Sequence, residues 1–425
     1  MRYRLSGPQL LLPVFALFTF VSTDQTMAFE DKIQQLPATE VELVERLEGA
    51  GLSREGMATI LAASRPALEL DTTPAAEDTI PLGMSRIGGR PDLPRGMPWP
   101  VRDAYENADD LAKVFNTDAE NLYADAGLRP PWLSEADGRK LVQERKRLNE
   151  EVWASTRALM EEAGVEIEFD PNDIERPEEE EIEAEALQWR AKAEAVGKPF
   201  PLAFIGQFDM AALSAQKGFD PLLPNTGRLL LFYDRWILPP SFDPRAGAGV
   251  RLIYDETSVS ELVRAEPPEE FQAAVDPRQF LLASAAIKPR SVITTIPAGG
   301  PSWRALGLSD EEDANRYHEW LYTLGWPTEE SGNHQLGGWP RAIQTGMQSQ
   351  SQLAANGVYA GTSEAYESAE AKRLLANAQD WRLVLQIGRD DALGLTLPGA
   401  FYVLMRQEDL AERRFDKAWL VYEQD

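Results

Sequence analysis

The segment from residue 85 to residue 100 decides how this chain is organised, and it reads SRIGGRPDLPRGMPWP. Its four prolines and three glycines predict neither a helix nor a central β-strand, because proline lacks a backbone N–H and glycine weakens both elements. Gly88 and Gly89 permit positive φ angles or the close approach of another backbone segment. Trp99, held between two prolines, is expected to be largely buried and to plug the neighbouring core with a rigid apolar ring.

The second half of the chain repeats three features of the first half in the same order. A glycine pair followed by proline comes first, an apolar strand ending in glutamine comes second, and a Leu-Pro turn leading into a strand comes third. The matched segments are Gly88-Gly89-Arg90-Pro91 with Gly337-Gly338-Trp339-Pro340, Leu202–Gln207 with Leu383–Gln386, and Leu223–Leu229 with Leu397–Tyr402. Three weak matches in one order predict an internal duplication.

The expected fold is α+β, with two related half-domains of mixed sheet and helices. Residues 29–79 are predicted to form an N-terminal helical region, residues 80–300 the first half and residues 301–425 the second half. Residues 37–70 are expected to hold two short helices, the second of which ends at Arg65-Pro66, followed by a loop through Thr72 and Pro74. Further helices are predicted over 309–324 and 364–378, and strands over 202–205, 228–233, 250–254, 291–296, 383–387, 400–405 and 419–422.

An acidic stretch interrupts the first half. Residues 101–200 hold 13 Lys and Arg against 26 Asp and Glu, a net charge of 13 − 26 = −13. Their apolar residues are spaced for amphipathic helices, so we predict a helical insertion at about 103–198. Its Glu-rich part, around Pro177–Glu185, is expected to be an exposed, mobile connector, because too few apolar residues offset the cost of ordering it.

The first 28 residues have two interpretations. Arg2 and Arg4 precede an apolar core over 10–21, which is too short to span a bilayer but typical of a signal peptide. The alternative is a misassigned start, with translation beginning at Met27. We expect a cytoplasmic protein, with export through an N-terminal signal peptide as the alternative.

Composition excludes several classes of function. Lys and Arg number 42 against 69 Asp and Glu, and the net charge of −27 disfavours binding to nucleic acids or to anionic membranes. The chain has no cysteine and only two histidines, so disulfides, thiolate metal sites and three-histidine metal sites are impossible. No phosphate-binding glycine motif is present, and we therefore expect neither a cofactor nor a metal, and no stable membrane association of the mature chain.

Four polar residues are the candidate ligand-binding residues, namely Gln207, Asp209, His334 and Gln344. They flank predicted strands or the second glycine pair, and could converge on one polar pocket between the two halves. The alternative is structural: a buried glutamine amide satisfied by loop backbone, and a histidine that holds the turn. His318, on a predicted helix, is expected at the surface.

The same segments resemble the YwqG-like family of bacterial proteins, a domain of unknown function. The resemblance covers roughly residues 80–425 without most of 101–198, and it implies an α+β, mostly cytoplasmic protein without a settled activity. It is carried by Ile87–Pro91 with Trp99, Phe204–Asp209, Leu223–Phe232, His334–Gly338 with Gln344, and Leu385-Gln386. Its structural motif residues here are Gly88, Gly89, Pro91, Trp99, Gly337, Gly338 and Gln386.

Two functions therefore remain open. The leading hypothesis is a non-catalytic binding or protein-interaction module, whose partner is an unidentified protein or small molecule. The alternative is a hydrolase or carbohydrate-acting enzyme that uses carboxylates and glutamines in the cleft between the halves. Two carboxylates with strongly perturbed pKa values in one deep pocket would favour the enzyme, whereas a shallow, apolar-rimmed surface patch would favour the binding module.

Overall fold

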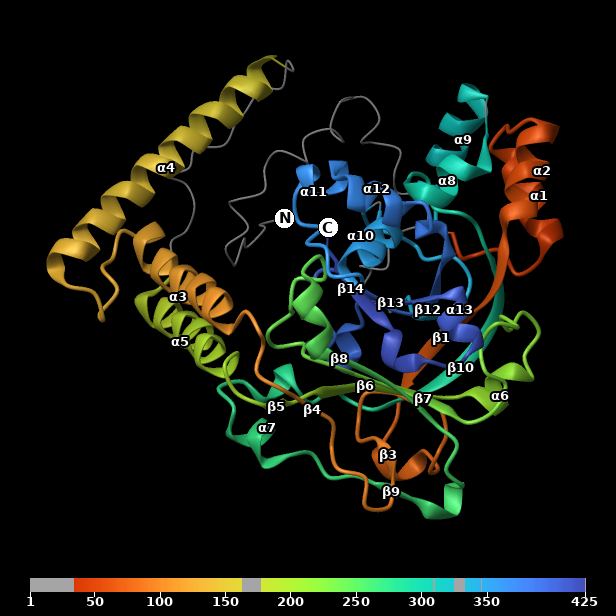
Figure 1. Cartoon of the computed structure of the whole chain (residues 1–425), viewed down its shortest axis with the longest axis horizontal. Helices are drawn as coiled ribbons and strands as arrows, with labels where there is room; N and C mark the ends of the chain where they lie inside the picture. The colour runs from red at the N-terminus through yellow and green to blue at the C-terminus, as the bar shows by residue number, and fades with distance from the viewer. Residues whose placement is uncertain (1–33, 163–176, 309, 325–332, 345, 425) are drawn as a thin grey trace. The chain divides into compact units, whose positions relative to one another are not determined.

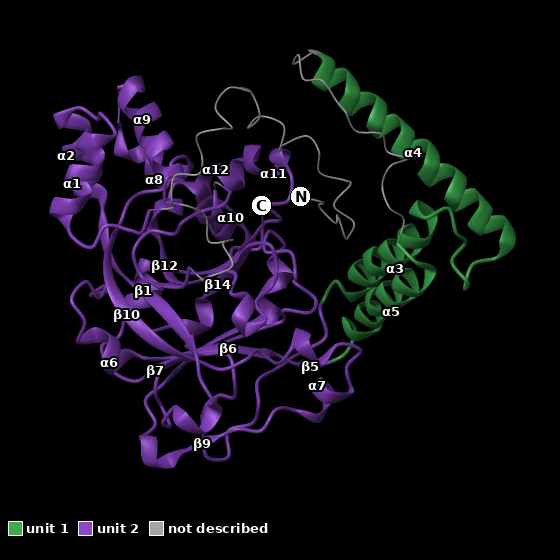
Figure 2. Cartoon of the chain, turned by 180° about the vertical axis from the view of Figure 1, so that it is seen from behind, with its two compact units in different colours: residues 1–32, 106–198 green, residues 33–105, 199–425 purple. Residues whose placement is uncertain are grey.

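A computed structural model describes residues 34–162, 177–308, 310–324, 333–344 and 346–424 (Figure 1). The signal-peptide interpretation of residues 1–28 lies outside the described residues. The described chain falls into two compact units, one holding residues 106–198 and the other residues 33–105 and 199–425 (Figure 2). Each unit is described separately below.

The larger unit is built on a ten-stranded antiparallel sheet, with strand order β14-β13-β12-β11-β1-β10-β2-β6-β7-β8 (Figure 1). Its middle is the pairing of β1 with β10 over ten residues, from Arg65 opposite Thr294 to Pro74 opposite Ala285. The strands are β1 Arg65–Pro74, β2 Arg86–Ile87, β6 Ala203–Asp209, β7 Arg228–Tyr233, β8 Val250–Asp255, β10 Ala285–Thr294, β11 Gln335–Leu336, β12 Trp381–Ile387, β13 Ala400–Arg406 and β14 Trp419–Glu423. Two small antiparallel pairs accompany the sheet, β3 Asp92–Pro94 with β9 Leu262–Arg264 and β4 Val101–Arg102 with β5 Phe200–Pro201. The α+β class is confirmed.

Two sequence-based expectations about strands were wrong. Residues 65–74 form the central strand β1 and not a loop. Because β1 is covered on both faces around Leu68 and Leu70, it lacks the polar–apolar alternation that marks a half-buried strand. The segment 85–100 also contributes a central strand, β2, which lies between β10 and β6. This strand is only two residues long, because the turn at Gly88 ends it.

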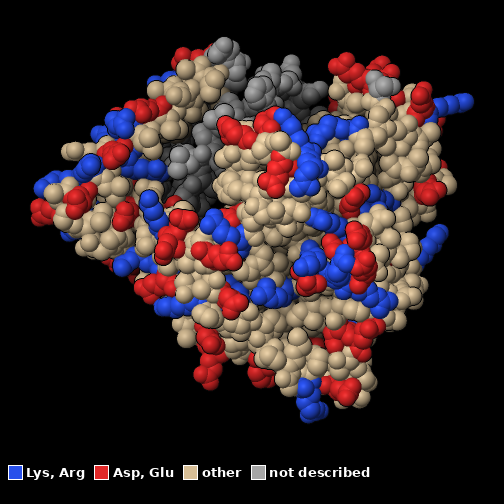
Figure 3. All heavy atoms as spheres, viewed as in Figure 1, with Lys and Arg blue, Asp and Glu red and all other residues tan. Residues whose placement is uncertain are grey.

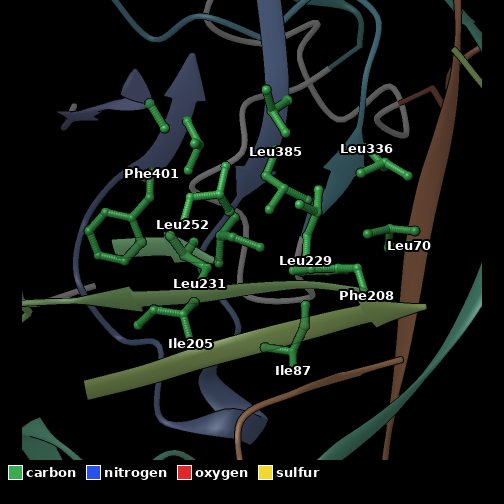
Figure 4. Packing of buried hydrophobic residues seen from close by; sticks show 14 of the residues in the cluster. Leu70, Ile87, Ile205, Phe208, Leu229, Leu231, Leu252, Leu336, Leu385 and Phe401 are labelled. Atoms are coloured by element: carbon green, nitrogen blue, oxygen red, sulfur yellow. The ribbon is translucent and has the colours of Figure 1, made fainter. Parts of the chain in front are cut away.

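The two ends of the sheet share one apolar core. The ring centroids of Tyr233 on β7 and Phe401 on β13 lie 5.1 Å apart, and those of Tyr254 on β8 and Phe415 lie 5.2 Å apart. Leucines from β7 and β12 point into the same space (Figure 4). The sheet therefore curls until its end strands pack on one another, which removes a large apolar area from water.

Helices cover the outside of this unit, and the two expected N-terminal helices are confirmed. Thr39 and Ser53 cap them by accepting hydrogen bonds from backbone N–H groups in the first turn. The helix expected over 364–378 is split at Ser368, whose hydroxyl accepts a bond from Ala371 and starts a new helix. The helices are α1 Glu40–Gly49, α2 Arg54–Ala63, α6 Met210–Ser214, α7 Glu269–Ala273, α8 Gly300–Leu306, α9 Glu311–Tyr322, α10 Met347–Ala354, α11 Ser363–Glu367, α12 Ala369–Leu375 and α13 Gln407–Ala411.

The smaller unit consists of helices α3 Ala108–Asp125, α4 Glu135–Glu162 and α5 Glu179–Ala195. The expectation of a connector around 177–185 was wrong, because α5 begins at Glu179, although most of these residues are exposed as expected. Ile182 and Ala186 are buried one turn apart, and they pack with Ala119 and Tyr123 of α3. One apolar residue per turn is thus sufficient to hold this acidic segment as a helix.

The described helices include none that is long and apolar enough to cross a membrane. On the face of the molecule in Figure 3, acidic and basic side chains are interspersed. The large negative net charge therefore does not appear on this face as one acidic surface.

We predict that residues 106–198 are dispensable for folding of the larger unit. β4 and β5 flank this segment and pair with each other, so a short Gly/Ser linker could join them. Tyr105 is kept because its hydroxyl donates to Asp234, 2.9 Å away. The shortened chain should unfold in one cooperative transition in a calorimeter, whereas an insoluble product or a broad, non-cooperative melt would contradict the prediction.

A second prediction concerns Trp99, which is partly buried, with its indole N–H donating to the Leu202 carbonyl at 2.8 Å. Its ring packs edge-on against Phe232 and Phe271, at 5.7 and 5.8 Å between centroids. Trp99→Ala should destabilise the fold by about 3 kcal/mol. Trp99→Phe, which keeps an aromatic ring but loses the hydrogen bond, should cost about 1 kcal/mol. Urea unfolding of both variants measures the difference, and an unchanged midpoint for Trp99→Ala would rule out a packing role.

Candidate functional site

Gln207 lies on β6 and is completely buried. Its Nε2 donates to the Met84 carbonyl at 2.8 Å and to Asp92 Oδ2 at 2.7 Å, and its Oε1 accepts from the Asp92 N–H at 2.9 Å. The amide therefore bridges the chain before and after the first glycine pair. Both amide hydrogens and the carbonyl oxygen of the side chain are thus engaged within the fold, and the side chain does not face solvent.

Gln386 lies on β12 and is also completely buried. Its Nε2 donates to the Asn333 carbonyl at 2.8 Å, and its Oε1 accepts from the Arg341 N–H at 2.9 Å. The bridge again joins the chain before and after a glycine pair. Both glutamines thus hold a loop in place, as the structural alternative for a buried glutamine supposes.

The glycine pairs need positive φ angles, which are 67° and 69° at Gly88 and Gly89, and 71° and 73° at Gly337 and Gly338. A Cβ atom on Gly338 would lie 2.5 Å from the hydroxyl oxygen of Thr294, closer than any real contact. Glycine is therefore required at this position both by the backbone angle and by the close approach of β10. The turn directs the chain out of β11 and sets the position of the next residue, Trp339.

Asp209 and Gln344 have local structural roles. The Asp209 carboxylate caps α6 by accepting hydrogen bonds from the N–H groups of Ala211 and Ala212 at 3.1 and 3.2 Å. Gln344 is exposed, and its amide donates to the Gln424 carbonyl at 3.0 Å. Within the described part of the chain, no hydrogen bond joins any two of Gln207, Asp209, His334 and Gln344.

His334 is 1% exposed and faces Asp390. Its Nε2 lies 3.4 Å from Asp390 Oδ2, which also accepts a bond from the Thr72 hydroxyl at 2.7 Å. Burial acts to raise the pKa of Asp390, but the hydrogen bonds from His334 and Thr72 hold this pKa below its usual value. The group ties the start of β11 to β1 and to the loop after β12. His318, in contrast, is exposed and stacks on Tyr322, as expected.

A buried ion network lies beside the first glycine pair. Arg86 and Asp92 are both fully buried, and Arg86 Nη2 lies 3.3 Å from Asp92 Oδ2. Arg264 Nε contacts the other carboxylate oxygen at 3.0 Å, and the Gly83 N–H donates to Oδ2 at 2.8 Å. Asp92 is thus surrounded by donors, which satisfies its charge and fixes the loop. No sequence pattern indicates this network, although Arg86 and Asp92 flank the glycine pair.

A hollow lies beside the second glycine pair. Its cavity volume is about 30 Å³, and the space counted out to open solvent is about 460 Å³. Its walls come from the loop after β10, from the segment after Gly338, from the start of α10, and from β12 and β13. The apolar members that matter below are Trp339, Met347, Trp381, Leu383 and Leu404, and the charged member is Arg65. No sequence pattern indicates this site, because its residues come from segments that are distant in the chain.

Indole hydrogen bonds fix the aromatic walls of the hollow. Trp339 Nε1 donates to the Ala63 carbonyl at 2.7 Å, and its backbone N–H donates to the Thr294 hydroxyl at 2.8 Å. Trp381 Nε1 donates to Gln352 Oε1 at 2.7 Å. With their N–H groups satisfied elsewhere, both indoles line the hollow as apolar rings and are themselves almost completely buried.

Near the hollow, the loop after Pro340 is held by a buried carboxylate. Glu423 on β14 is 4% exposed, and its Oε2 accepts from the N–H groups of Ile343 and Gln344 at 3.0 and 2.9 Å. Desolvation raises the pKa of Glu423 to about 8, although these two hydrogen bonds oppose the rise. The folded chain therefore retains this proton over a pH range in which an unfolded chain has lost it.

This difference predicts a pH dependence of stability. Between the ordinary pKa of 4.5 and the raised value of about 8, the folded form binds more protons, so the Glu423 contribution falls as pH rises. Glu423→Gln removes the titration, and its melting temperature should decline less than that of the wild type between about pH 5 and about pH 9. Glu364→Gln, at an exposed position, is the control. Parallel profiles for Glu423→Gln and the wild type would refute the assignment.

No group of three or more His, Asp or Glu within the described residues is arranged to hold a metal ion. A comparison with curated proteins finds no match. The sequence profile of the family described as "Domain of unknown function (DUF1963)" matches residues 85–423. The match spans well over half of the chain and includes both glycine pairs and both buried glutamines, so the chain belongs to the DUF1963 family of domains of unknown function.

Proposed function

We propose that this chain is a non-catalytic binding protein whose second half holds a small molecule in the hollow beside Trp339. The observation that carries the proposal is a difference between the two halves. In the first half, the ring of Trp99 packs next to the sheet, whereas the corresponding place in the second half keeps a small hollow over the buried side chains of Leu383 and Leu404. A concave, mainly apolar site with few polar groups is the usual form of a small-molecule site.

We further propose that the larger unit arose by duplication, which makes the two places comparable. The strand order supports this idea, because reading inward from either end gives three consecutive long strands and then a two-residue strand. β6 and β12 each have a bulge at the same point, between Phe204 and Gly206 and between Leu383 and Leu385. The backbone partners of Gln207 and Gln386 also lie at matching offsets from the glycine pairs.

Under this proposal, the strand register shows which residues correspond beside Trp99 in the first half and beside the hollow in the second half. Phe204 lies opposite Phe232 in the first half, and Leu383 lies opposite Leu404 in the second. Trp99 packs against Phe232, whereas the corresponding Leu404 lines the hollow. The second half provides no equivalent of the Pro-Trp-Pro segment, and its glycine pair is followed instead by Trp339 in the hollow wall.

We favour binding over hydrolysis for two reasons. A carboxylate-based hydrolase needs two acids flanking the substrate, and the described lining of the hollow includes neither Asp nor Glu. Gln207 and Gln386, the other groups that such an enzyme would use, are engaged with loop backbone. The polar groups considered for catalysis thus serve the fold.

The finer sequence-based expectations remain part of this proposal. We propose a YwqG-like, cytoplasmic bacterial protein, with export as the alternative, in which residues 106–198 are an acidic helical insertion. Such an insertion would select a basic protein partner, and salt would weaken that association.

The proposal predicts that the wild-type chain binds small aromatic fragments, and that filling the hollow prevents it. Ala298, on the loop after β10, lines the hollow, and Ala298→Trp should weaken binding at least tenfold. Ala411→Trp adds the same ring at an exposed position and should bind like the wild type. Ligand-observed NMR with a panel of neutral and charged aromatic fragments measures this. If no fragment binds the wild type, or if Ala298→Trp binds equally well, the proposed function is wrong.

A further inference from the structure

Arg65 is the charged group of the hollow, and its guanidinium is unusually isolated. Its carbon atom lies 3.3 Å from the centroid of the Trp339 ring. No hydrogen bond or ion pair of this guanidinium occurs with any described residue, and Nη1 is buried without a partner. Buried donors are normally satisfied, so a guanidinium that lines the hollow and has no acceptor departs from the usual pattern.

The surrounding charges do not compensate Arg65. Two charged residues act on the guanidinium of Arg65, namely Arg382, which repels it, and Asp220, which attracts it. These two residues also contact each other, with Arg382 Nη2 3.3 Å from Asp220 Oδ2. Two guanidinium groups thus share one carboxylate. Desolvation, followed by the repulsion from Arg382, lowers the pKa of Arg65 to about 9 despite the attraction of Asp220. At neutral pH the side chain remains a cation in a place that disfavours its charge.

The backbone holds this cation in position. Arg65 is the first residue of β1 and pairs with Thr294 on β10. The Thr294 hydroxyl donates to the Arg65 carbonyl at 2.9 Å and accepts from the Trp339 backbone N–H, so one side chain links the backbones of Arg65 and Trp339. The cation and the aromatic wall are therefore arranged before any ligand arrives, which reduces the entropic cost of binding.

We propose that the hollow binds the carboxylate of a small molecule with an apolar body, and that Arg65 pairs with this carboxylate. The inference rests on the proposed function and specifies its ligand. A guanidinium matches a carboxylate through two parallel hydrogen bonds. Trp381, Leu383 and Leu404 provide the apolar wall for the body of the ligand. A phosphate is a poorer fit, because its second charge would meet no other Lys or Arg in the described lining.

A matched pair of probes tests the inference. In titrations of the full-length protein, 2-naphthoate should bind at least tenfold more tightly than 2-naphthamide, which has the same ring and no charge. 2-Naphthyl phosphate should not exceed the naphthoate. In Arg65→Gln, the preference for the acid should disappear while the affinity for the amide stays unchanged. Equal affinities of the wild type for acid and amide would overturn the carboxylate assignment and leave the proposed function standing. A tighter phosphate would overturn the ligand class.

Thermal stability provides a second readout that needs no ligand. If Arg65 is kept for a ligand, Arg65→Met should fold and melt at the same or a higher temperature than the wild type, because it removes an unpaired, partly buried charge. A strongly lowered melting temperature would mean that Arg65 supports Trp339 structurally, and the inference would be wrong. Trp99→Met, which removes a packed ring in the first half, is the comparison and should melt at a lower temperature.

Discussion

The pairing of β1 with β10 is the constraint on which the rest of the larger unit depends. It joins ten residues of one strand to ten of the other, and every other strand of the main sheet lies to one side of it or the other. β11–β14 follow on the β1 side, and β2 with β6–β8 follow on the β10 side. Since both sides then curl onto one core, a shift in this register would displace the partners of every buried side chain. The same pairing brings Arg65 beside Thr294 and so defines the edge of the hollow.

The glycine pairs end the short strands β2 and β11 and position the residues that follow them. At each pair the chain leaves a two-residue strand with positive φ angles, and a buried glutamine amide holds the segments on either side. At Gly338, the turn also brings Trp339 against β10 and the end of α2, where its two N–H groups find acceptors in Thr294 and Ala63. The motif that was most conspicuous in the sequence is therefore a scaffold. The residue that it positions, and not the motif itself, forms the wall of the hollow.

What could be predicted from the sequence was local. The strands β7, β8, β12, β13 and β14 and the helices α1 and α2 follow from short apolar patterns and caps, and these predictions are confirmed. β1 was missed because both of its faces are covered, and the helical start of α5 was missed because glutamates outnumber its buried residues. The hollow could not be found at all, since Arg65 looked like the end of a helix. The guanidinium of Arg65 lies over the ring of Trp339, which is 274 positions away in the chain.

Proteins keep unfavourable local arrangements mainly where function requires them. The first half follows the ordinary rules: Asp92 is surrounded by donors, Trp99 is packed, and its indole N–H is bonded. A departure from them lies at the hollow, where the partly buried guanidinium of Arg65 has no acceptor and lies on the ring of Trp339. A neutral side chain there would spare the fold the desolvation of a charge. A ligand that supplies the acceptor would offset this cost, and the proposal of a carboxylate ligand rests on that balance.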